Sequence, residues 1–337
     1  MNTPVFLGLI LCIQTIPFIA SASPDLPPLK CNDLPLLQET AEKLAAARLK
    51  LGDITYSYTW EHVTGPALDP DSEQEALIAN TTTRGASEVV ISGNLWYKST
   101  EKTSHHVSGD SVSERECAVL SKSFLGFATQ VIGQRGNMQQ FDIDTNGEMS
   151  ERASALKDIL FGNELIQYGF GDGTAYLDEH LRRHPDANKW NIFKQEDGLV
   201  RLQRFSPVIA DKQTPDCEWF IDPNQGWLIV RVINRGETGE ILFEININAG
   251  ELQPGIWFPT AYTRNEGTAS SKANIASIQI NTPVRKTAFE WEGFGTALEG
   301  YAGFREMTTG ETRNFVVQNG VPIEAPTNKV FGIQTTR

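Results

Sequence analysis

The feature that most constrains this chain is a run of strict apolar–polar alternation near its N-terminus. Ile54, Tyr56, Tyr58 and Trp60 are separated from one another by single polar residues. Because successive side chains of a strand point to opposite faces, this period of two places four large side chains on one side of a β-strand. The sequence therefore requires a sheet with one apolar face and something to cover it.

Short β patterns and turn residues recur through the rest of the chain. Residues 222–226, Asp-Pro-Asn-Gln-Gly, have the composition of a hairpin turn. Strands and helices do not alternate as they would in a parallel α/β fold. The sequence thus predicts an α+β, mainly β protein, with a large curved antiparallel sheet (a half-barrel) covered on one face by a few helices. Further strands are expected at residues 88–99, 200–205, 218–221, 227–233, 241–248, 255–263, 276–282 and 287–291.

Two helices are candidates for that cover. Asp33 can cap a helix in which Leu37, Ala41 and Leu44 recur at helical spacing. A second helix is expected to start at Ser150. Residues 104–115 are polar and rich in serine, which predicts a surface loop, and residues 117–133 are apolar without a clear period, so both helix and strand stay open there.

The first 22 residues predict export. An almost wholly apolar segment ends in Ala20-Ser21-Ala22, the small-residue pattern that signal peptidase cleaves. A membrane anchor is the alternative, but spanning a bilayer takes about 20 consecutive apolar residues, and Pro17 and polar residues interrupt this segment. We expect a periplasmic or secreted protein that is not an integral membrane protein after cleavage. The expected parts are a signal peptide (1–22), a linker (23–32), a single β-rich domain (33–295) and a C-terminal hairpin or extended tail (296–337).

Charge and cysteine content narrow the partners and the covalent structure. The formal net charge is −13, which disfavours binding to nucleic acid because phosphate backbones are repelled. Signal cleavage removes Cys12 and leaves three cysteines, so at most one internal disulfide can form. Cys117 with Cys217 is the candidate disulfide, and three thiols are the alternative.

Motifs for metal binding and catalysis are incomplete. Residues 142–147 resemble the start of a calcium-binding loop, but Ala153 stands where a bidentate Glu is required. His180 and His184 have the spacing of two metal ligands, whereas Leu181 replaces the Glu of a zinc protease. We therefore predict no enzymatic activity, no metal and no cofactor. A secreted hydrolase that uses two of the many carboxylates is the minor alternative.

The aromatic face of the first strand is the candidate binding site. It can line a cavity for a lipid or acyl chain, or it can be ordinary core beneath a helix. Apolar residues of later strands are expected to join it. The candidate ligand-binding residues are Ile54, Tyr56, Tyr58, Trp60, Phe243, Ile245, Trp257 and Trp291.

A family resemblance rests on two segments. Residues 218–223 (Glu-Trp-Phe-Ile-Asp-Pro) continue through Gly226 and Trp227 into Val230 and Arg231, and residues 255–259 read Gly-Ile-Trp-Phe-Pro. Together with the order of elements over residues 34–294, this resembles the bacterial outer-membrane lipoprotein carrier (LolA-like) superfamily, in particular its divergent secreted members. The resemblance implies a half-barrel closed by helices, and a partner that is an apolar ligand or a lipid-modified protein. A non-catalytic envelope module with a filled core, which binds an envelope protein, is the alternative.

Overall fold

The computed structural model describes residues 31–66, 79–143, 149–162, 164–171, 176–178, 181, 190–205 and 214–325. The predicted signal peptide, residues 144–147 of the calcium-loop motif, and the pair His180 and His184 lie outside these ranges.

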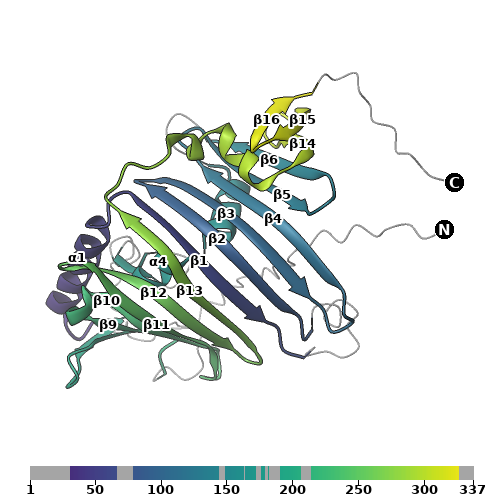
Figure 1. The fold of residues 1–337 in the computed structure, drawn as a ribbon. Coiled ribbons are helices and arrows are strands. Elements are labelled where there is room, and N and C mark those ends of the chain that lie inside the picture. Colours follow the sequence, from purple (N-terminus) through teal and green to yellow (C-terminus); the bar gives the residue numbers. More distant parts are fainter. Residues whose placement is uncertain are drawn as a thin grey trace, which may run out of the picture.

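One large open sheet dominates the molecule (Figure 1). Among the residues described, it has 16 strands in the order β16-β15-β14-β6-β5-β4-β3-β2-β1-β13-β12-β11-β10-β9-β8-β7. All neighbouring strands are antiparallel except β14 and β6, which are parallel. The strands are β1 (Ile54–Val63), β2 (Thr82–Ser92), β3 (Leu95–His105), β4 (Ser111–Leu120), β5 (Phe124–Val131), β6 (Gly136–Asp142), β7 (Trp190–Lys194), β8 (Val200–Arg204), β9 (Cys217–Asp222), β10 (Leu228–Arg235), β11 (Ile241–Gln253), β12 (Ile256–Glu266), β13 (Ala269–Ile280), β14 (Gly300–Glu306), β15 (Thr312–Gln318) and β16 (Val321–Glu324).

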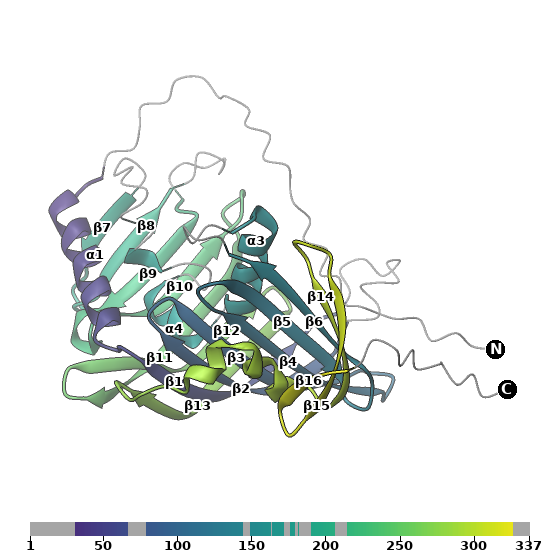
Figure 2. The ribbon, with the colours of Figure 1, turned by 90° about the horizontal axis from the view of Figure 1, so that it is seen from above.

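The sheet curves around its helices, as Figure 2 shows. Helices α1 (Leu34–Leu49), α3 (Glu151–Phe161) and α4 (Leu165–Phe170) lie on the concave side. Two 3-10 segments, η3 (Lys286–Phe289) and η4 (Trp291–Ala297), pack on the opposite side. We call the face that carries Tyr56 and Tyr58 the concave face and its reverse the outer face. The predicted fold class is confirmed, as are the two predicted helices, which are α1 and α3.

The middle of the sheet is buried on both faces, so it has two hydrophobic cores. Val89 and Ile91 join the core under the helices, whereas Val90 between them joins the core under η3 and η4. In β4, Ala118 faces the first core and Val119 the second. Strands buried on both sides lose the apolar–polar alternation, which explains why residues 117–133 showed no clear period. They form the end of β4 and all of β5.

Three local predictions are wrong. Residues 88–99 do not form one strand, because a turn at Gly93 (φ 58°) divides β2 from β3. Residues 104–115 are mostly strand, since cross-strand hydroxyl pairs such as Thr103–Ser113 (2.9 Å) suit a polar β surface. Residues 287–291 are 3-10 turns rather than a strand.

Each edge of the open sheet has an outward-facing position that is protected from further strand pairing. At β7, the Asn32 amide donates to the Ile192 carbonyl (2.8 Å) and accepts from its N–H (2.7 Å). At β16, the pairing of Val317 with Pro322 turns the imino nitrogen of proline outward, where it has no hydrogen to donate. Such devices prevent another chain from adding a strand to an exposed edge.

Candidate functional site

The concave face changes from apolar to polar along its strands. Where the helices cover it, Ile54, Ile91, Trp96 and Leu120 face inward from four neighbouring strands and are buried. The next four rows toward the uncovered end carry polar side chains. In order, they contain Lys98; Thr100 and Glu116; Lys102 and Glu114; and His62 and Ser104. The concavity therefore has an apolar floor and a polar mouth.

Helix α4 fills the floor. Its described side chains are all buried, including Leu165 and Phe170, which are 0% exposed. It packs chiefly on β12, where Pro259 lies so close to Gly169 that a Cβ there would stand 2.8 Å from the proline Cγ. A side chain at this glycine would push the helix away from the sheet.

A buried carboxylate, Glu164, ties the start of α4 to the aromatic strand. Its oxygens accept hydrogen bonds from the hydroxyls of Tyr56 (3.2 Å) and Tyr58 (3.0 and 3.1 Å). Its Oε1 lies 2.6 Å from the Lys98 Nζ, which also donates to the Leu160 carbonyl of α3 (3.4 Å). A carboxylate that is 0% exposed requires such partners, because an unpaired buried charge is very costly.

The electrostatics of this cluster follow from burial and from Glu164. Burial alone would lower the pKa of Lys98, but the neighbouring carboxylate outweighs it and the pKa is raised. Burial, then the charge of Glu164, raise the pKa of Tyr56 and of Tyr58 well above the usual value. Lys98 is thus positive and both tyrosines are neutral around pH 7, so the cluster serves as a structural ion pair.

A second polar group extends the cluster toward the mouth. The Tyr168 ring of α4 packs against Tyr262 (centroids 4.7 Å apart), and its hydroxyl accepts from Arg264 Nη1 (3.3 Å). Arg264 also lies over the Phe243 ring (4.5 Å) and pairs with Glu266 (2.8 Å). The inner surface beyond α4 is therefore lined by half-buried aromatic rings with a few charges.

The structure separates the eight predicted ligand contacts into groups. Ile54, Tyr56, Tyr58 and Ile245 are buried against other parts of the chain on the concave face. Trp60 and Phe243 are half-buried there, on the side of the mouth. Trp257 packs over Gly226 in the turn between β9 and β10. The concave face thus brings together six of the eight, of which only Trp60 and Phe243 are partly open.

The assignment of Trp291 to the same site is wrong. Trp291 lies on the outer face, against Phe304 (centroids 5.0 Å apart) and Phe315 (5.3 Å). Its apolar character predicts burial, but a lone aromatic residue carries no signal of which face of the sheet it will cover.

The structure also does not form the predicted disulfide. Cys117 lies in the outer core, where its thiol donates to the Gly293 carbonyl (3.3 Å), whereas Cys217 lies in the core under the helices. Seven strands separate β4 from β9 in the sheet, and a disulfide needs Cα atoms within about 7 Å.

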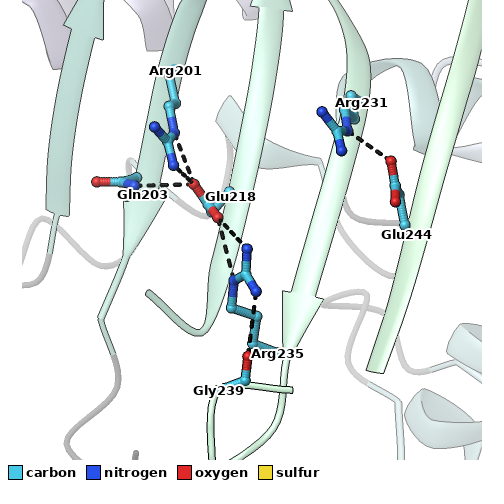
Figure 3. Close-up of polar contacts among 7 residues, drawn as sticks. All are labelled: Arg201, Gln203, Glu218, Arg231, Arg235, Gly239 and Glu244. Atoms are coloured by element: carbon cyan, nitrogen blue, oxygen red, sulfur yellow. Dashed lines mark hydrogen bonds and ion pairs between the residues drawn. The ribbon is translucent and has the colours of Figure 1, made fainter. Parts of the chain in front are cut away.

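The outer face of β8–β11 carries a polar network of its own (Figure 3). The Glu218 carboxylate accepts from Arg201, Gln203 and Arg235, and Arg231 pairs with Glu244 on the neighbouring strands. Burial would raise the pKa of Glu218, but the bonds from Gln203, Arg201 and Arg235 prevail and lower it. The network ties four neighbouring strands together by charge.

Glu164 and Lys98 are the residues at the centre of the concave face that the sequence did not predict. Lys98 had a detectable signal, since it follows Trp96 at an inward position of a strand. Glu164 and Gln167 have the spacing of a helix-start capping box, and the Gln167 side chain accepts from the Glu164 N–H (3.4 Å). Neither signal reveals that the two residues meet.

Within the residues that the structure describes, no group of three or more His, Cys, Asp and Glu side chains is placed to hold a metal ion. None of the helices described is long and apolar enough to cross a membrane.

Comparison with known proteins gives structural matches alone. No protein-family model and no curated protein matches the chain. In structure it is similar to a DUF1329 family protein from Desulfovibrio piger (TM-score 0.39, 10% identity, covering 80% of this chain and 100% of the other). It is also similar to a LolA superfamily protein from Nitrosomonas europaea (TM-score 0.35, 9% identity, covering 76% of this chain and 98% of the other).

Proposed function

We propose that this chain is an exported, non-catalytic binding protein that holds an apolar ligand, such as a lipid or an acyl chain, in its helix-covered half-barrel. The ligand would lie beside α4, between the filled floor and the polar mouth. The proposal includes Trp60 and Phe243 from the predicted set, and adds Phe127, Tyr262 and Ile275.

The observation that carries the proposal is the row of half-buried apolar side chains on the concave face. Phe127 and Ile275 lie on opposite sides of β1, and both are only partly covered. Trp60 lies across Gly85, where a Cβ would stand 2.6 Å from the indole ring. When a ligand removes this partly covered apolar surface from water, binding is favoured by about 25 cal/mol per Å².

The test compares the same substitution on the two faces. Phe127→Gln removes a half-buried ring from the concave face, and Phe220→Gln removes one from the outer face of β9. Binding of the uncharged probe N-phenyl-1-naphthylamine should weaken about tenfold in the first variant and stay unchanged in the second. Native mass spectrometry of the protein purified from its exported compartment should show an added mass that extracts as lipid.

Equal probe affinity in the two variants, or a bare protein mass with no probe binding, would contradict the proposal. One observation favours a second candidate, a non-catalytic envelope module with a filled core that binds a protein. Tyr56 and Tyr58, the centre of the predicted cavity wall, are covered by α4 and bonded to Glu164. A bare mass without probe binding would be expected for that module.

A further inference from the structure

A groove on the outer face lies on the opposite side of the sheet from the concave site. The C-terminal segment that leads into η3 and η4 forms one wall, and the turns β2–β3 and β4–β5 form the other. Its volume is about 790 Å³, within the range of pockets that hold small molecules. Its lining comes entirely from residues that the structure describes.

The apolar part of this groove centres on a tryptophan that packs against other rings. Leu95, Phe124, Val284 and Trp291 line it, and each is half-buried. Trp291 is held by three rings, because Phe294 (5.2 Å), Phe304 and Phe315 surround it. Because the indole is fixed before any ligand arrives, binding would cost little side-chain entropy.

The charged part of the groove carries both signs. Lys122 in the β4–β5 turn and Lys286 in η3 are exposed, as are Glu290 and Glu292 on either side of Trp291. None of these four side chains has an ion-pair partner among the residues described. Asp53, the other acidic residue of the lining, accepts from Ser92 Oγ (2.7 Å).

We propose that this groove binds a small amphiphile whose head group carries one negative and one positive charge. The apolar tail would lie on Leu95, Phe124 and Val284. Lys122 and Lys286 would attract the anionic group, for which a phosphate is suited. Glu290, Glu292 and the Trp291 ring would attract an ammonium group, because an aromatic face binds cations.

Charge complementarity selects this class over simpler amphiphiles. A purely anionic head group would meet Glu290 and Glu292 as well as the lysines. An uncharged head group would leave all four charges without a partner. A head group with both charges satisfies both pairs at once.

The test uses dodecylphosphocholine below its micelle-forming concentration, with dodecyl maltoside as the uncharged comparison. We expect calorimetric titration of the full chain to show binding of the phosphocholine, and Lys122→Glu with Lys286→Glu to weaken it about tenfold. Lys43→Glu, on the exposed side of α1, is the matched control and should have no effect. All three positions are exposed, so each variant should fold.

Tryptophan emission locates the ligand. Binding should change the emission of the wild-type protein, and the part of that change that Trp291→Phe removes should be the part that Lys122→Glu with Lys286→Glu also removes. If the change persists in Trp291→Phe and disappears in Phe127→Gln, the amphiphile binds only on the concave face, which overturns this site and leaves the proposed function intact. Equal affinities of both detergents in all variants would overturn the head-group specificity.

Discussion

At the scale of single residues, the chemistry of the concave face centres on one carboxylate. Glu164 meets Tyr56 and Tyr58 across 108 and 106 residues of sequence. Its Oε1, which accepts from Tyr58, also lies 2.6 Å from the Lys98 Nζ. The alternation of β1 predicted the inward direction of the tyrosines correctly. It could not predict Glu164, because local pattern contains no information on where a short helix will settle above the sheet.

The cluster predicts a loss of stability at alkaline pH. Burial and Glu164 raise the pKa of both tyrosines above 10.0, so above about pH 10 the unfolded chain releases protons that the folded protein retains. The raised pKa of Lys98 acts in the same direction, since its stabilising charge is complete below 10.5 and is lost as the pH rises through the folded value. The urea concentration at the unfolding midpoint should therefore decrease as the pH is raised from 9 to 11.5.

The control for this prediction is Tyr58→Phe, which removes one of the titrating groups. The variant should be less stable at pH 7 by about 1–3 kcal/mol, because Glu164 loses a buried hydrogen bond. Its stability should also depend less steeply on pH above 10. Identical slopes for variant and wild type would show that the cluster does not account for the alkaline loss.

At the scale of elements, two segments without an obvious amphipathic pattern pack on opposite faces of the sheet. Helix α4 covers the concave face, whereas η4 covers Cys117 and Val119 on the outer face. Residues 287–291 read as a strand because their local pattern suits one. Their actual conformation depends on an apolar surface presented by strands more than 150 residues earlier, which sequence pattern cannot convey.

Two glycines make room for these contacts and offer a matched pair of variants. A Cβ at Gly126 would lie 2.1 Å from Phe294 of η4, and one at Gly85 would lie 2.6 Å from Trp60. Each Ala substitution should destabilise the protein by about 1–3 kcal/mol through overpacking. Gly126→Ala should raise hydrogen exchange in η4 and β14–β16, whereas Gly85→Ala should instead alter probe binding on the concave face. Identical exchange patterns in both variants would contradict the separation into two cores.

At the scale of the whole molecule, fold class could be predicted from strand patterns and turn residues, since these are local. The strand order could not. The parallel pairing of β14 with β6 and the burial of the C-terminal segment on the outer face depend on contacts between distant segments. The relative position of Cys117 and Cys217 also depends on contacts between distant segments. Their residue type predicted a disulfide, but they lie on strands far apart in the sheet and on opposite faces, which excludes it.

The open sheet also predicts the oligomeric behaviour of an edge variant. Asn32→Ala would free the N–H and carbonyl of Ile192 on the outward side of β7. We expect concentration-dependent dimers, detected by light scattering, and a loss of about 1–2 kcal/mol of stability. Asn32→Asp can accept from the Ile192 N–H but cannot donate to the carbonyl. Its stability and its tendency to dimerise should lie between those of the wild-type protein and those of Asn32→Ala. A variant that stays monomeric at all concentrations would show that the Asn32 side chain does not protect this edge.

The pairing of β1 with β13 has a consequence for how the chain acquires its structure. Ser57 and Ser277 share a hydrogen bond (2.7 Å) across 220 residues, whereas β2, the other neighbour of β1 in the sheet, is the next strand along the chain. Strands β1–β6 and strands β7–β13 can each form as a meander of neighbouring strands. The seam between them, the pairing of β1 with β13, forms only after most of the chain is present. Contacts of such high order make folding slow, and until the seam closes, two long strand edges are open to a chaperone or to another copy of the chain.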